Sequence, residues 1–196
     1  MPDFPQMPLT RRNLLLAAVA TGAAGIVPAE AKPTLTADGL YREPWFLESF
    51  LDLRDDLQQS TKEGKRFAIM WELKGCPYCK ETHFVNFAQP RIADYIKANF
   101  NITLLNIIGS LPVTDFDGEQ LPEKKLAAKY GVRFTPTFQF FPADLDAIKK
   151  LPPLKREVAR APGYLRPDDF LAMFRFVRDK AYEKGSFRDF LKSQPS

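Results

Sequence analysis

The two cysteines of this 196-residue chain stand close together in the stretch Gly75-Cys76-Pro77-Tyr78-Cys79-Lys80. An apolar run at 67–71, long enough for a buried strand, precedes them, and a helical pattern begins at Pro77. Cys76 is therefore expected at a helix N-terminus, where free N–H groups and the helix dipole favour a thiolate. Cys79, one turn further on, can reach a disulfide formed through Cys76. The spacing is typical of a thiol–disulfide exchange site with Cys76 as nucleophile and Cys79 as resolving thiol.

Other roles for the cysteines stay open. A structural disulfide normally joins distant segments, whereas a ring closed by residues 76–79 constrains the chain little. A zinc site needs four ligands, and beside the two cysteines the chain has one histidine, His83. Copper(I)-carrier loops tend to carry methionine where Lys74 stands. A metal carrier that uses the same thiols is therefore the non-enzymatic alternative, and redox chemistry is favoured.

Residues 1–31 are predicted to be a twin-arginine export signal, cleaved after Ala31. Arg11-Arg12 precedes an apolar stretch that ends at Val27, and Ala29-Glu30-Ala31 is a cleavage pattern. The stretch is about 14 residues long, which is short for a bilayer span. An uncleaved anchor and the general secretory route are the alternatives. The remaining chain is expected to be periplasmic, where a single close cysteine pair indicates chemistry.

Residues 32–196 are expected to form a single domain, since about 165 residues can bury a sizeable core. A hydrophobic content of 45% with 17 phenylalanines argues against disorder. The net charge of +4 is small and the positive side chains are dispersed, so nucleic acid is not an expected partner. One basic run is interpreted as a solvated hairpin, or else as a docking site for an acidic partner. It comprises Lys149, Lys150, Lys155, Arg156 and Arg160.

Hydrophobic periodicity predicts helices at Pro44 to Gln59, at Pro77 to Ala88, and again from Pro90 onward. Later helices are expected at Pro122 to Tyr130, closed by Gly131, and at Pro167 to Tyr182. The residues expected to face inward are Phe46, Phe50, Leu53, Leu57, Phe84, Phe87, Ala88, Ile92, Tyr95, Ile96, Phe170, Leu171, Phe174 and Val177. Strands are expected at 102–108, at 137–141 after Pro136, and at 157–161. The acidic turn at 114–119 lacks the ligand spacing of a calcium loop.

Thr135-Pro136 stands at the head of an apolar strand, a position that tolerates the missing N–H of proline. With Cys76-Pro77-Tyr78-Cys79 after an earlier strand, the chain resembles the thioredoxin superfamily from about Pro44 to Tyr182. The resemblance implies an α/β thioredoxin fold, with a central mixed β-sheet flanked by helices in the order β-α-β-α-β-β-α. It also implies an N-terminal helical extension, a helical insertion after the CxxC helix, and a cis-proline at Pro136. Gly163 matches a glycine that the family keeps near the active site.

Within the superfamily the chain is most similar to the periplasmic thioredoxin-like proteins of sulfur-oxidation gene clusters, the SoxW type. The similarity lies in the Gly-Cys-Pro-Tyr-Cys site and in the stretches 86–90, 114–118 and 134–137. It implies a reductant that acts on protein disulfides or thiols and receives electrons from a membrane thiol donor. No cofactor is expected, and the chain is expected to be a monomer. A disulfide oxidase or isomerase is the alternative enzyme.

The expected substrate groove is formed by Pro77, Tyr78, Thr135 and Pro136, where an extended segment could pair with backbone. The Pro-Tyr dipeptide is that of glutaredoxins, but the paired glycines and aspartate that bind glutathione are missing after Pro136. Glutathione is therefore not an expected ligand.

The proton relay to Cys79 is expected to differ from that of many thioredoxins. They bury an aspartate six residues before the first cysteine, where this chain has Met70. Glu72, on the same strand face, is the candidate relay residue, with a rim carboxylate paired to Lys74 or Lys80 as the alternative. His83 is interpreted as an ordinary helix residue, or else as one that tunes the redox site.

Overall fold

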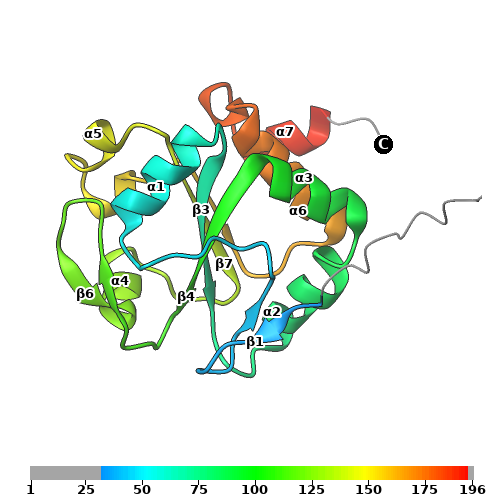
Figure 1. Ribbon diagram of the computed structural model, residues 1–196. Coiled ribbons are helices and arrows are strands. Elements are labelled where there is room, and N and C mark those ends of the chain that lie inside the picture. The colour runs from blue at the N-terminus through cyan, green and yellow to red at the C-terminus, as the bar shows by residue number, and fades with distance from the viewer. Residues whose placement is uncertain (1–31, 194–196) are drawn as a thin grey trace, which may run out of the picture. The chain divides into compact units, whose positions relative to one another are not determined.

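A four-stranded sheet with the strand order β4-β3-β7-β8 forms the centre of the structure, a computed structural model that describes residues 32–193 (Figure 1). β3 pairs in parallel with β4 and antiparallel with β7, which pairs antiparallel with β8. The strand bounds are β3 Arg66–Glu72, β4 Phe100–Asn106, β7 Thr137–Phe141 and β8 Ala159–Pro162. The predicted export signal lies outside the described residues.

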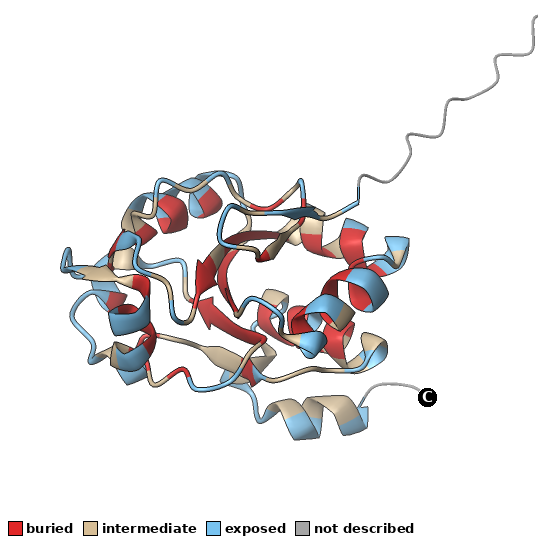
Figure 2. Cartoon of the chain, turned by 90° about the horizontal axis from the view of Figure 1, so that it is seen from below, coloured by how far each residue is buried: buried red, intermediate tan, exposed pale blue. Residues whose placement is uncertain are grey.

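Helices cover both faces of the sheet, because β3 alternates its side chains between two cores. Ala68 and Met70 contribute to the core under α3 (Pro90–Asn99) and α6 (Pro167–Arg178). A second core packs under α1 (Leu53–Lys62), α4 (Glu123–Lys129) and α5 (Leu145–Ile148), and β3 contributes Phe67, Ile69 and Trp71 to it. Figure 2 shows buried residues concentrated in the strands of the central sheet and exposed residues on the outer sides of the helices. None of the helices within residues 32–193 is long and apolar enough to cross a membrane.

The shorter elements lie outside the central sheet. Two hairpins, β1–β2 and β5–β6, are separate two-stranded sheets. The remaining bounds are β1 Thr34–Leu35, β2 Tyr41–Arg42, α2 Pro77–Glu81, η1 Thr82–Asn86, β5 Pro112–Thr114, β6 Gln120–Pro122, η2 Pro153–Lys155, η3 Ala181–Glu183 and α7 Phe187–Ser193.

The first helix begins later than predicted. It starts at Leu53 rather than Pro44, with Asp52 as N-cap accepting a hydrogen bond from the N–H of Arg54. Leu51 has a φ of 62°, which breaks any continuous helix through this point. Phe46 is buried as expected, whereas Phe50 is fully exposed. The residues before Asp52 are thus an irregular segment, not a helix.

The helix after the cysteines changes from α-helical to π-helical before it ends. The α-helical turn of α2 passes into a π-helix, η1, in which Phe87 donates its N–H to the carbonyl of Thr82. The buried side chains here are Thr82, His83, Asn86 and Phe87, whereas Phe84 and Ala88 are exposed. The predicted inner face is therefore correct for Phe87 and wrong for Phe84 and Ala88.

The later elements agree with the sequence prediction, apart from the basic run. Ile92 and Ile96 of α3 are buried, and so are the four residues predicted for the inner face of α6. In the basic run, Arg156 is only 4% exposed and bonds Asp115 and Asp117. Arg160 pairs with Glu157 and with backbone carbonyls at 130 and 131. The run is therefore not a single solvated patch.

Candidate active site

The two cysteines lie where the central strand leads into α2. β3 ends at Glu72, and Gly75 turns the chain at a φ of 77°, a backbone conformation that favours glycine. Cys76 is the N-cap of α2 and is joined to Cys79 by a disulfide with a Cα–Cα distance of 5.3 Å. Cys76 is partly exposed, whereas Cys79 is 1% exposed. One sulfur can therefore meet a protein substrate and the other cannot.

Hydrogen-bond donors converge on the sulfur of Cys76. The N–H of Cys79 lies 3.1 Å from Sγ, and the hydroxyl of Thr135 lies 3.4 Å from it. The Thr135–Pro136 peptide bond is cis, as the resemblance implied, and Pro136 is buried. The carbonyl of Pro136 accepts a hydrogen bond of 2.7 Å from the N–H of Gly163. Backbone and side-chain donors of this kind favour the anionic form of a thiol.

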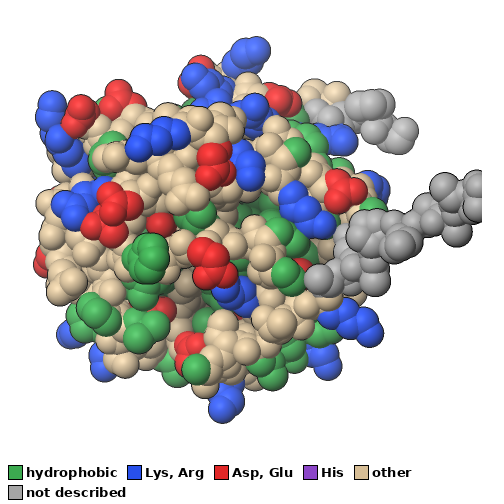
Figure 3. All heavy atoms as spheres, in the orientation of Figure 1, with side chains coloured by type: hydrophobic (Ala, Val, Ile, Leu, Met, Phe, Trp, Pro, Cys, Tyr) green, Lys and Arg blue, Asp and Glu red, His purple; other side chains and the backbone are tan. Residues whose placement is uncertain are grey.

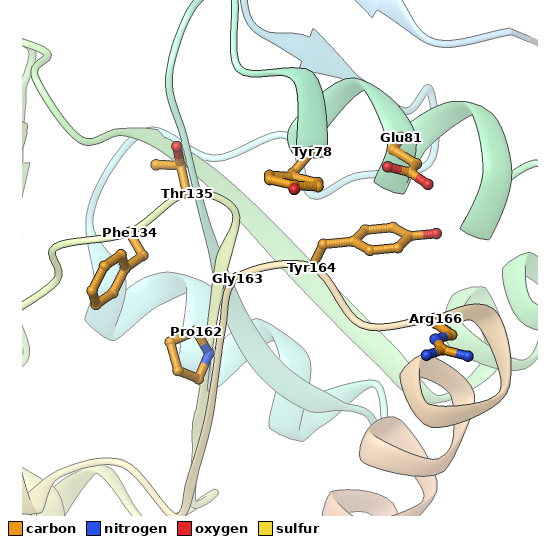
Figure 4. Close-up of a pocket in the computed structure, with 8 residues that line it drawn as sticks. All are labelled: Tyr78, Glu81, Phe134, Thr135, Pro162, Gly163, Tyr164 and Arg166. Atoms are coloured by element: carbon orange, nitrogen blue, oxygen red, sulfur yellow. The ribbon is translucent and has the colours of Figure 1, made fainter.

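A groove of about 810 Å³ lies beside the cysteines (Figure 4). Its walls come from three segments that are far apart in the sequence. The lining residues are Tyr78, Glu81, Phe134, Thr135, Pro162, Gly163, Tyr164 and Arg166. In Figure 4 Tyr78 and Tyr164 lie one above the other, with Arg166 at one end of the groove and Phe134 at the other.

The groove is aromatic along its length and charged at one end. The Tyr78 and Tyr164 rings stack with centroids 6.1 Å apart. Phe134 is 65% exposed, which leaves most of its ring open to a ligand. Partial burial and the nearby charge of Glu81 raise the pKa of Tyr164, so its hydroxyl is neutral at physiological pH. An extended chain with an apolar side chain fits this surface better than a small anion does.

Behind the cysteines, the imidazole of His83 bridges two carboxylates. Its Nδ1 lies 2.7 Å from Oε1 of Glu43, and its Nε2 lies 2.8 Å from Oε1 of Glu72. His83 is 1% exposed, Glu43 is 4% and Glu72 is 0%. The second oxygen of Glu72, Oε2, is buried and has no hydrogen-bond partner among residues 32–193. These three residues are called the Glu43–His83–Glu72 cluster.

The charge state of this cluster follows from its contacts. Burial lowers the pKa of His83, but hydrogen bonds and Coulombic attraction from Glu43 and Glu72 outweigh burial, so its pKa lies above the ordinary value. The cluster therefore favours the protonated ring, which donates one hydrogen bond to each carboxylate.

The residues predicted from the sequence lie in different parts of this site. Tyr78 and Thr135 line the groove, Pro136 is buried beneath it, and Pro77 is exposed at the start of α2. Glu72 is not a rim carboxylate, because it is fully buried and pairs with His83, while Lys74 and Lys80 are exposed.

The sequence prediction missed several residues of the site. Phe134, Pro162, Tyr164, Glu81 and Arg166 complete the groove. An aromatic residue after Gly163 was the available signal for Tyr164, and the others carry no local pattern. Glu43 stands just before the helix predicted from Pro44, and no sequence pattern connected it with the cysteines.

Two further observations concern the distribution of charge on the surface and the possibility of a metal site. On the face in Figure 3, basic and acidic side chains are interspersed, without a continuous basic stripe. Within residues 32–193, no group of three or more histidine, cysteine, aspartate or glutamate side chains is arranged to hold a metal ion.

Comparisons with known proteins agree with this geometry. The family described as the thioredoxin-like domain matches residues 53–178, more than half of the chain. A thioredoxin-fold protein from Helicobacter pylori is 21% identical, with a TM-score of 0.55, over 76% of this chain and 86% of that one. A thioredoxin from Thermus thermophilus is 23% identical, with a TM-score of 0.48, over 67% and 88%. The periplasmic thioredoxin SoxS from Paracoccus pantotrophus is 23% identical, with a TM-score of 0.38, over 60% and 99%.

A search of curated protein sequences found no match. The family match covers the whole of the central sheet, both cysteines and the cis-proline segment. The structural likeness to the Helicobacter pylori protein extends over most of both chains. The fold is therefore the thioredoxin fold, and the chain belongs to the thioredoxin-like domain family.

Proposed function

We propose that this protein is a thiol–disulfide oxidoreductase that transfers two electrons from the Cys76–Cys79 dithiol to disulfides of other proteins. The observation that supports this most directly is the difference between the two sulfurs. Sγ of Cys76 is accessible and lies among hydrogen-bond donors, whereas Cys79 is buried behind it. A nucleophilic thiolate needs access and stabilisation, and a resolving thiol needs only to reach the first sulfur.

The reaction proceeds in two exchanges. The thiolate of Cys76 attacks one sulfur of the substrate disulfide, forms a mixed disulfide and releases the other substrate sulfur as a thiolate, which is then protonated. Cys79 then loses its proton, attacks Sγ of Cys76 and releases the second substrate thiol. The proton of Cys79 passes to a base, for which Glu72 is our candidate. The protein ends as the Cys76–Cys79 disulfide and the substrate as two thiols.

The proposed substrates are exported proteins, and the groove supports an extended substrate segment. Its aromatic rings Tyr78, Phe134 and Tyr164 offer apolar contact area, and Thr135 lies beside the reactive sulfur. We propose a periplasmic location and a membrane thiol donor that re-reduces the pair. Both follow from the resemblance to the SoxW type and from the export signal expected in residues 1–31.

Trapping of the mixed disulfide tests the proposed roles. Reduced Cys79→Ser protein, incubated with insulin, should accumulate a covalent adduct that disappears on adding dithiothreitol, because nothing resolves it. Wild type should reduce insulin with turnover, and Cys76→Ser should neither trap nor turn over. Non-reducing gels and intact mass measure the adduct.

Two results would contradict the proposal. Equal trapping by both variants would mean that the division of roles is wrong. Stoichiometric binding of copper(I) or zinc after gel filtration, without insulin reduction by wild type, would instead support a metal carrier.

A further inference from the structure

The buried Glu43–His83–Glu72 cluster connects three separate parts of the chain next to the resolving thiol. Glu43 comes from the irregular segment after β2, Glu72 is the last residue of β3, and His83 lies in η1. His83 follows Cys79 by four residues on the same helical stretch, so the two side chains lie one above the other. π-helical turns such as η1 are often found at functional sites.

Burial of the cluster costs folding free energy unless its charges compensate each other. Two carboxylates buried together would repel, and a positive imidazole between them removes that repulsion. The ring contacts mostly aromatic side chains, with centroid distances of 5.7 Å to Tyr41, 5.9 Å to Phe46 and 5.4 Å to Phe87. Water does not screen charges in such surroundings, so each interaction inside the cluster is strong.

One of the two buried oxygens of Glu72 has no partner in the part of the chain that the structure describes. Oε1 pairs with Nε2 of His83, while Oε2 accepts no hydrogen bond from any described residue. An ionised carboxylate with a free acceptor atom in a dry site is a strong base, because a proton there relieves an unmet hydrogen bond. Cys79 is 1% exposed and must lose its proton during resolution, so a protein group rather than solvent has to receive it.

We propose that His83, held by Glu43, is a positioning residue that fixes Glu72 through Oε1 and directs its second oxygen, Oε2, to receive the Cys79 proton. This inference rests on the proposed function. In the reverse direction, when a donor reduces the disulfide, Glu72 returns the proton to the Cys79 thiolate. No other reactant is needed, because the proton exchanged is the one that the thiol releases.

The groups around the cluster set its pH dependence. From β2, Tyr41 faces the ring, and from α2 Cys79 lies one turn away. From β4, Asn106 stands in register beside Glu72 and donates a hydrogen bond to Asp38. Burial is the largest single effect on the pKa of Asp38 and raises it, but hydrogen bonds from Thr36 and Asn106 together lower it below the ordinary value, so Asp38 is ionised at neutral pH. The cation paired with Glu72 is His83.

The pH profile of the resolving step tests the proposal. Stoichiometric reduced protein is mixed with a self-quenched disulfide peptide, samples are quenched in acid, and mixed disulfide and product are counted by mass. A buried glutamate without a cationic partner titrates at about pH 8–9. In His83→Gln, resolution at pH 7 should therefore fall by about tenfold to a hundredfold and recover toward the wild-type rate at about pH 9.

A second variant, Glu43→Gln, tests the same role if His83→Gln fails to fold. Glu43→Gln keeps the packing and an oxygen that accepts from Nδ1, but removes one charge that holds His83 protonated. Because it also removes a carboxylate that repels Glu72, it should move the midpoint of resolution downward, opposite to the shift in His83→Gln. Glu48→Gln, an exposed carboxylate in the same segment that pairs with Arg42, is the control and should match wild type.

The outcomes separate this inference from the function on which it rests. If wild type forms no mixed disulfide, the proposed function itself fails. If wild type resolves its mixed disulfide and the Glu43→Gln and His83→Gln profiles overlay it from about pH 5 to about pH 10, the positioning role of His83 is wrong.

Discussion

Single buried charges depend on their partners, and Arg156 is the clearest case. Its guanidinium donates to Asp115 at 2.9 Å and to Asp117 at 2.7 Å, and Asp115 is fully buried. Removal of Arg156 leaves Lys129 as the remaining cation paired with Asp115 and Asp117, so Arg156→Ala should lower the free energy of unfolding by at most about 3 kcal/mol. Urea denaturation measures this loss. Lys155→Ala, its exposed neighbour, should stay within about 0.5 kcal/mol of wild type.

The loss of stability expected for Arg156→Ala should depend on pH. Burial raises the pKa of Asp117, but hydrogen bonds from Lys129 and Arg156 outweigh it, so the pKa lies below the ordinary 3.8. A carboxylate with a lowered folded pKa stabilises the fold above its unfolded pKa, and that contribution is lost as the pH falls through the folded pKa. The cost of Arg156→Ala should be full at pH 7 and should shrink in acid. A cost that is independent of pH would mean that packing, not charge, explains it.

For single residues, the sequence predicted which residues belong to the site better than it predicted their burial and contacts. The cysteine pair was found from its spacing, and Thr135-Pro136 was placed at the site by the resemblance to the thioredoxin superfamily. The burial of Arg156 and His83 was not predicted, because a sequence records charge but not burial, and the partners of His83 are 40 and 11 residues away from it in the chain. Glu72 was chosen from strand alternation, which correctly predicts its face but not that it is buried against an imidazole.

The start of α1 shows where periodicity fails for an element. Phe46, Phe50, Leu53 and Leu57 have helical spacing, yet the first two precede the helix. Asp52 caps the helix and Leu51 has a positive φ, so the backbone changes direction between Phe50 and Leu53. Phe46 packs on Trp45 and Phe87 at centroid distances of 4.9 and 5.6 Å. Local capping thus overrides a hydrophobic stripe.

Two matched substitutions distinguish the observed segment from a continuous helix. Phe46→Ala should lower the free energy of unfolding by about 3–5 kcal/mol, because it removes a buried ring. Phe50→Ala should change it by less than about 0.5 kcal/mol, because that ring is fully exposed. Thermal and urea unfolding measure both. Similar large losses from the two variants would place Phe50 in the core and contradict this account.

The whole fold was predictable, whereas only Tyr78 and Thr135 of the groove lining were predicted. The cysteine motif follows β3 and the cis-proline segment precedes β7, and these two strands are paired in the sheet. Together the two motifs identify the family, and the family implies the order of strands and helices. The groove is assembled from α2, the segment before β7, the end of β8 and the residues before α6, and its shape arises only after folding. Exposed aromatic residues such as Phe134 follow no hydrophobic periodicity, so nothing in the sequence distinguishes them from ordinary strand or loop residues.

Electron flow is a property of the whole molecule, since it depends on every charge around the dithiol. A thiolate that is strongly stabilised over the disulfide makes an oxidant. Strong oxidants of the superfamily often carry a histidine inside the motif, where this chain has the neutral Tyr78. Lys74 and Lys80 are exposed and screened, and the positive His83 is compensated by two carboxylates. The remaining stabilisation of Cys76 comes from the N–H of Cys79 and the hydroxyl of Thr135.

The reduction potential is therefore expected to be moderate, about −200 to −270 mV, between the values of glutaredoxins and thioredoxins. Equilibration with glutathione buffers, followed by alkylation and thiol counting by mass, measures it. Tyr78→His places a cation inside the motif and should shift the potential toward oxidant values, while Lys80→Gln should leave it nearly unchanged. A wild-type potential near about −120 mV, with oxidation of reduced peptides faster than reduction of disulfides, would make the protein an oxidase rather than a reductase.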